Sequence, residues 1–178
     1  LVSSHEDIKK EVGRLLHAQG WNVASLDLPC HGNDRRAGEP AEIPGWAVRI
    51  AAGEDLVAAF RQRVNEVVEH LVKTGIADPH CLAAAGTSRG GFMAFQVAAG
   101  NPHIRAVAAF SPVTDLSALT EFAGLNANPL VHRLALMQSV EPLADRAAWI
   151  TIGNADTRVG TDKAAAFDYT GMLVDGCR

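Results

Sequence analysis

Three short, largely apolar runs, separated by segments with helical periodicity, constrain the fold of this chain most strongly. The runs cover residues 81–85, 106–110 and 149–152, and each has the length of a β-strand. Runs that are apolar on both faces are typical of strands buried on both sides of a parallel sheet. A chain in which such strands alternate with helices folds as an α/β protein. The sequence therefore predicts a three-layer α/β sandwich with a doubly wound, mostly parallel sheet.

Helices, one further strand and a loop are expected around these runs. A capping pattern at residues 3–6 begins a helix that Gly20 ends, and residues 21–27 are predicted to form a strand. A loop rich in proline and glycine is expected from Pro29 to Gly45. An amphipathic helix follows from about Glu54 to Lys73. The other expected helices cover residues 90–99, 116–122, 130–137 and 163–174.

Charge and composition exclude several classes of protein. The 178 residues carry a net charge of −4, whereas binding of nucleic acid needs clustered Lys and Arg. The most basic stretch, residues 34–36, is expected to be a solvated turn. No apolar run reaches the roughly 18 residues of a membrane helix, so neither a nucleic acid nor a membrane is an expected partner. The length fits one domain over residues 1–178.

The cysteine pattern bears on metal binding and location. The sequence has three cysteines and no C-x-x-C spacing, which indicates neither a disulfide framework nor a zinc site. Reduced thiols make the cytoplasm the default location.

Residues 86–90 form a G-x-S-x-G motif between a predicted strand and a predicted helix, the context of a nucleophile elbow. The sharp turn from strand to helix forces Ser88 into a strained conformation with positive φ, and glycines let the two elements approach closely. The Ser88 hydroxyl then stands at the carboxyl edge of the sheet. The backbone N–H of Arg89 points to the same space, where it can stabilise the oxyanion of a tetrahedral intermediate. The motif predicts Ser88 as nucleophile and the Arg89 N–H as oxyanion donor.

Two other interpretations of this motif stay open. In the first, Ser88 only caps the helix in a glycine-rich turn. In the second, positions 86, 88 and 91 belong to a dinucleotide-binding loop. Ser88 then stands where a glycine usually lets the backbone approach the pyrophosphate, and no acid follows about 20 residues later at the end of a strand.

A serine nucleophile needs a base, and the base needs an acid that orients it. Asp156 follows the strand at 149–152 and is the predicted acid, because the chain order in such sheets is Ser, acid, His. An Asx turn is the alternative role for Asp156. Asp115 is the second choice for the acid, and Asp162 is expected to cap the last helix. All seven histidines precede Asp156, and His132 is the one that could enter the cleft from a cap segment.

Three segments together resemble a known family. They are D-x-P-x-H-G at residues 27–32, the elbow at residues 86–91, and G-x-x-D-x-x-V at residues 153–159. Their order and spacing are similar to those of the α/β-hydrolase superfamily, in its dienelactone hydrolase and prolyl-oligopeptidase-like branch. The resemblance implies an α/β-hydrolase fold with Ser88 as nucleophile, Asp156 as acid and the Arg89 N–H as oxyanion donor. It also implies a structural role for His31 and no need for a cofactor or metal.

Two departures from the family pattern affect the expected activity. Family members carry strands and an oxyanion loop before the first helix, and a strand and a loop with the catalytic His after the last. The chain is expected to lack both, so that it would have neither a complete triad nor the second oxyanion donor. The bare edges of such a sheet favour pairing with a second copy.

The expected function of the parent protein is that of a serine hydrolase, which cleaves a small carboxylic ester through an acyl-enzyme. One alternative is a serine peptidase of the prolyl oligopeptidase type. The other is a binding module that has the α/β-hydrolase fold but no catalytic activity.

Overall fold

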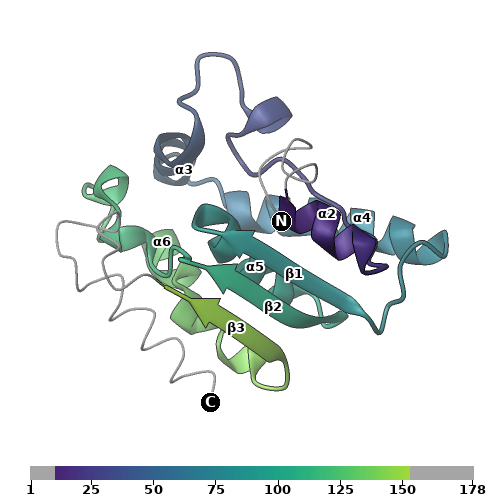
Figure 1. Ribbon diagram of the computed structural model, residues 1–178. Coiled ribbons are helices and arrows are strands. Elements are labelled where there is room, and N and C mark those ends of the chain that lie inside the picture. Colours follow the sequence, from purple (N-terminus) through teal and green to yellow (C-terminus); the bar gives the residue numbers. More distant parts are fainter. Residues whose placement is uncertain (1–10, 153–178) are drawn as a thin grey trace.

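The computed structural model describes residues 11–152, and its centre is a parallel sheet of three strands (Figure 1). Strands β1 (Leu82–Thr87), β2 (Ile104–Phe110) and β3 (Ala147–Thr151) lie side by side in this order. The register pairs Thr87 with Phe110 and Phe110 with Thr151, so the carboxyl ends of the strands meet at one edge. The predicted parallel sheet is confirmed for these three strands.

Helix α5 (Arg89–Gly100) packs against β1 and β2 (Figure 1), and its residues Gly90–Ala98 are all buried. Helix α4 (Leu56–Lys73) contacts α5 and is capped by Asp55, whose side chain accepts a hydrogen bond from the Ala58 N–H at 2.9 Å. Both helices agree with the sequence prediction, which for α4 rests on its apolar face. The remaining helices are α2 (Glu11–Ala18), α3 (Glu42–Ala51) and α6 (Pro129–Leu134). No helix in this part of the chain is long and apolar enough to cross a membrane.

Large aromatic side chains form the centre of the hydrophobic core. Trp46 of α3, Phe60 of α4, and Phe92 and Phe95 of α5 are all fully buried. Trp46 and Phe92 are in direct contact, with ring centroids 5.8 Å apart. Burial of such side chains is the main driving force for folding, and here it fixes α3 and α4 against the helix that follows the elbow.

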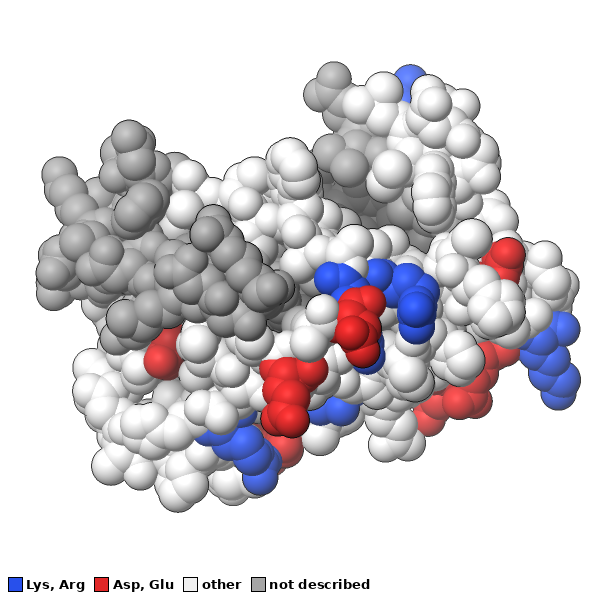
Figure 2. Space-filling model, turned by 90° about the horizontal axis from the view of Figure 1, so that it is seen from below, with Lys and Arg blue, Asp and Glu red and all other residues white. Residues whose placement is uncertain are grey.

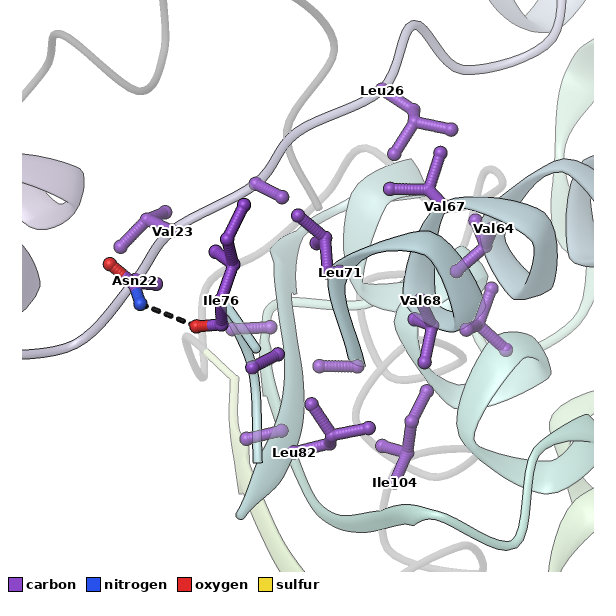
Figure 3. A pocket seen from close by; sticks show the side chains of 16 residues that line it. Asn22, Val23, Leu26, Val64, Val67, Val68, Leu71, Ile76, Leu82 and Ile104 are labelled. Atoms are coloured by element: carbon purple, nitrogen blue, oxygen red, sulfur yellow. Dashed lines mark hydrogen bonds between the residues drawn. The ribbon is translucent and has the colours of Figure 1, made fainter. Parts of the chain in front are cut away.

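The predicted strand at residues 21–27 is wrong, because the structure has no strand between residues 21 and 28. Asn22, Val23, Ala24 and Leu26 instead line an apolar groove of about 170 Å³, whose other walls come mainly from α4 and β1 (Figure 3). A strand exists only where its backbone forms a ladder with a neighbour. Among the described strands β1 pairs with β2 alone. Residues 21–27 therefore form no ladder with β1, and their apolar side chains contribute to the groove instead.

The loop expected from Pro29 to Gly45 ends earlier than predicted, because α3 begins at Glu42. We call residues 29–41 the 29–41 loop. Pro44 suggested a loop, yet proline is tolerated in the first turn of a helix, where the N–H has no helical partner. A Cβ on Gly45 would lie 2.7 Å from Cys30 Cβ, so this glycine is explained by close packing of the helix against the loop.

The last predicted helices differ in part from the structure. The helix expected at residues 116–122 consists of two 3₁₀ turns, Leu116–Ala118 and Thr120–Phe122. The segment 130–137 forms α6 and the start of a 3₁₀ turn, Leu136–Ser139. The helix predicted at 163–174 lies outside the described residues.

Candidate active site

Ser88 occupies the turn between β1 and α5 and has φ 53° and ψ −120°. A residue other than glycine rarely adopts this conformation, which costs about 1–3 kcal/mol and persists only when the surroundings enforce it. The positive φ that the motif predicted is therefore confirmed. Ser88 is partly exposed, as expected for a side chain that a substrate must reach.

Backbone hydrogen bonds hold Ser88 in this conformation from two sides. Its N–H donates to the carbonyl oxygen of Phe110, at the end of β2, over 2.8 Å. Its own carbonyl oxygen accepts from the N–H of Phe92 at 3.1 Å and from that of Val113 at 3.2 Å. The turn is thus bonded both to the neighbouring strand and to the first turn of α5.

The glycines of the motif are explained by close approach of strand and helix. A Cβ on Gly86 would collide with the carbonyl group of Gly90 and lie 2.7 Å from Gly91 N. A Cβ on Gly91 would lie 3.0 Å from Pro112 Cβ. Gly86 leaves room for hydrogen only, so this turn needs glycine there, whereas a Cβ on Gly91 would need a small shift of Pro112 or Ala109.

Arg89 is the first residue of α5, and its N–H belongs to the first turn, which has no carbonyl partner within the helix. Such N–H groups carry the partial positive charge of a helix N-terminus. The Arg89 side chain forms an ion pair with Glu42, the first residue of α3, with 2.9 Å between Nη1 and Oε2. The Arg89 side chain therefore extends to α3. The Arg89 N–H belongs to the peptide bond that directly follows Ser88.

His31 in the 29–41 loop is buried, with 7% of its surface exposed. Its Nδ1 lies 2.7 Å from the carbonyl oxygen of Pro29, which also accepts a hydrogen bond from Trp46 Nε1 at 2.6 Å. Burial lowers the pKa of His31, and the nearby positive charge of Arg89 also lowers it. A neutral ring whose Nδ1–H donates to Pro29 holds the loop together, which favours the structural role that the resemblance implied.

A buried ionic cluster fixes the 29–41 loop on α3 and α4. Arg49 of α3 is 6% exposed and donates from Nε and Nη2 to Glu39, at 2.6 and 2.7 Å. It also donates from Nη1 to Asp34 Oδ1 at 2.7 Å, and Arg63 of α4 donates to Asp34 Oδ2 at 2.6 Å. The hydrogen bonds from Arg49 lower the pKa of Glu39 to about 2. The expectation of a solvated turn at residues 34–36 is therefore wrong for Asp34.

Acidic and basic side chains also lie close together on the surface of the protein. On the face shown in Figure 2, acidic and basic side chains lie next to one another and do not form separate patches. Arg36, on the same loop, pairs with Glu54 at 2.7 Å in an exposed ion pair.

Of the two candidates for the acid, Asp115 and Asp156, only Asp115 lies within the described residues. Asp115 caps the turn Leu116–Ala118, because its Oδ1 accepts from Ser117 N at 2.8 Å and from Ser117 Oγ at 2.7 Å. This engagement disfavours Asp115 as the acid of a triad. Strand β3 ends at Thr151, at the same sheet edge as Ser88, but Asp156 and Asp162 lie outside the described residues. His132 is exposed on α6.

The comparison with known families decides the superfamily. Residues 59–167, more than half of the chain, match the prolyl oligopeptidase family. The chain belongs to this family. The match extends across both Ser88 and Asp156, and the family has the α/β-hydrolase fold and consists of serine hydrolases and peptidases. No individual curated protein matches this prolyl oligopeptidase family member.

Proposed function

We propose that this member of the prolyl oligopeptidase family hydrolyses carboxylic esters through an acyl-enzyme formed on Ser88. The observation that carries the proposal is the strained backbone of Ser88, φ 53°, between a strand and a helix N-terminus. A capping residue does not need this conformation, since an N-cap usually has extended backbone. Moreover, the Ser88 side chain forms no capping hydrogen bond to α5.

The proposed reaction follows from these groups. A base takes the proton of the Ser88 hydroxyl while Oγ forms a bond to the ester carbonyl carbon, and the carbonyl oxygen takes the π electron pair. The Arg89 N–H donates to that oxyanion. The intermediate then expels the alcohol, which takes the proton from the base, and water releases the acid from Ser88 by the same steps. We assign to Asp156 the orientation of the base. All seven histidines of the sequence precede Asp156.

The substrate class rests on the resemblance that the three segments together show to the dienelactone hydrolase and prolyl-oligopeptidase-like branch, which favours a small carboxylic ester. The family match favours a peptide bond as the second candidate. We also propose that the parallel sheet continues into the doubly wound, three-layer sandwich that the sequence pattern predicts.

Labelling with a fluorophosphonate tests the nucleophile. The product of the complete reading frame should react rapidly, and Ser88→Ala should abolish the reaction. Ser111→Ala is the matched control, because Ser111 follows the neighbouring strand β2 and also has positive φ, 44°. Labelling that persists in Ser88→Ala would place the nucleophile at another residue, and no labelling at all would favour the non-catalytic module.

Hydrolysis rates separate the two substrate classes. A p-nitrophenyl ester of a short acid and a proline-containing peptide p-nitroanilide should be compared on the same preparation. The proposal expects a higher kcat/KM for the ester after correction for its faster spontaneous hydrolysis. A preference for the peptide would assign the chain to the peptidases of its family.

A further inference from the structure

One ion pair connects the elbow with a helix far from it in the sequence. Arg89 begins α5 and Glu42 begins α3, and their side chains meet at 2.9 Å. The Arg89 side chain is 20% exposed and that of Glu42 is 49% exposed. The contact is therefore partly shielded from solvent on the arginine side, the side that adjoins the elbow.

The Glu42 carboxylate stands on a well-fixed backbone. Glu42 has φ 63°, and its N–H donates to the carbonyl oxygen of Cys30 at 3.0 Å. Cys30 also has positive φ, 59°, and its N–H donates to Asp34 Oδ1 at 2.7 Å. Two strained residues are thus bonded to each other and to the buried ionic cluster, so the position of Glu42 is tied to that cluster.

The elbow needs such an anchor because Ser88 is held away from ordinary backbone conformations. A rotation of Ser88 toward an ordinary conformation would shift Arg89 and turn its N–H away from the substrate oxygen. An anchored Arg89 side chain opposes this rotation. We propose that Glu42 is a positioning residue: through its ion pair with Arg89 it keeps the Arg89 N–H directed at the oxyanion. This inference rests on the proposed function of Ser88.

The test compares Glu42→Gln with Glu69→Gln, an exposed glutamate on α4, in the product of the complete reading frame. Glu42→Gln should lower kcat for a p-nitrophenyl ester about threefold to fivefold, the range open to a partly exposed ion pair. KM and Tm should stay as in Glu69→Gln, because the lost orientation matters in the transition state and not in binding. In 1 M salt, where charges are screened within about 3 Å, the difference in kcat should shrink.

A double-variant cycle shows whether Glu42 acts through Arg89. Arg89→Gln with Glu42→Gln should be no slower than Arg89→Gln alone, and Arg89→Lys should keep more activity than Arg89→Gln. Additive losses, or a Glu42→Gln kcat equal to that of Glu69→Gln, would overturn the inference. If Ser88→Ala abolishes activity while Glu42→Gln has no effect, only this inference fails. If Ser88→Ala keeps the activity, the proposed function fails and the inference fails with it.

Discussion

Removal of the Arg49 guanidinium group is the sharpest test of what holds the 29–41 loop. Arg49→Met keeps a long apolar stem but leaves Glu39 without its ion-pair partner, while Asp34 keeps its ion pair with Arg63. Both carboxylates are shielded, with side chains 8% and 13% exposed. Loss of one partner from a buried ion pair costs about 3–5 kcal/mol, because the remaining charge stays desolvated and unpaired. A domain has roughly 5–15 kcal/mol of stability in total, so the variant should unfold at a clearly lower urea concentration.

The matched control is Arg36→Met in the same loop. Arg36 pairs with Glu54, but the two side chains are 58% and 41% exposed, and exposed ion pairs contribute little to stability. Urea unfolding followed by tryptophan fluorescence measures both variants. In the Arg49→Met background, Glu39→Gln should recover part of the loss, since it removes the charge that lost its partner. Equal midpoints for Arg49→Met and Arg36→Met would refute the reasoning.

The pH dependence follows from the sign of the Glu39 shift. Its pKa is lowered from 4.5 to about 2 in the folded protein, so its stabilising contribution is complete above about pH 4.5. The contribution is lost as the pH falls from there toward 2. The difference in unfolding free energy between the unmodified protein and Arg49→Met should therefore shrink over this window. A difference that stays constant from pH 6 to pH 3 would mean that Glu39 is not stabilised by Arg49.

Three further predictions concern the elbow and the triad. Gly86→Ala should lower stability and abolish fluorophosphonate labelling, because its Cβ would collide with backbone, whereas Gly124→Ala, with nothing within 4 Å, should do neither. Asp156→Asn should lower kcat by on the order of 10⁴, as expected for the orienting acid of a triad, while Asp115→Asn should leave most of the activity. His132→Ala should leave fluorophosphonate labelling unchanged, whereas loss of labelling in this variant would make His132 the base.

The parts of the fold that could be predicted are those encoded locally. The strands at 81–85 and 106–110 are apolar throughout, and the helix from about Glu54 has one apolar face, so short windows identify them. The conformation of Ser88 could be predicted for a similar reason. A glycine on each side and the change from strand to helix within a few residues leave the chain few other ways to turn.

The parts that could not be predicted depend on partners distant in the sequence. Residues 21–27 have the pattern of a strand. A strand also needs a neighbouring strand with which to form hydrogen bonds, and the local sequence does not show whether one is present. The charges of residues 34–36 look solvated in a short window, yet Asp34 pairs with Arg63 on another element. Helix α3 was missed because Pro44 and Gly45 signal a turn, and only the packing of Gly45 against Cys30 explains the glycine inside a helix.

Two of these misses, the environment of Asp34 and helix α3 itself, meet at α3, which carries Glu42, Trp46 and Arg49. Arg49 bonds the helix to the 29–41 loop, Trp46 packs on Phe92 of α5, and Glu42 pairs with Arg89. The Arg49 and Glu42 variants should therefore separate stability from catalysis. Arg49→Met loosens the base on which Glu42 stands, so it should lower both the unfolding free energy and kcat. Glu42→Gln leaves the buried cluster intact, so it should lower kcat alone. If Arg49→Met lowers stability but leaves kcat unchanged under conditions where it is fully folded, then the elbow keeps its geometry without α3, and its backbone hydrogen bonds are sufficient.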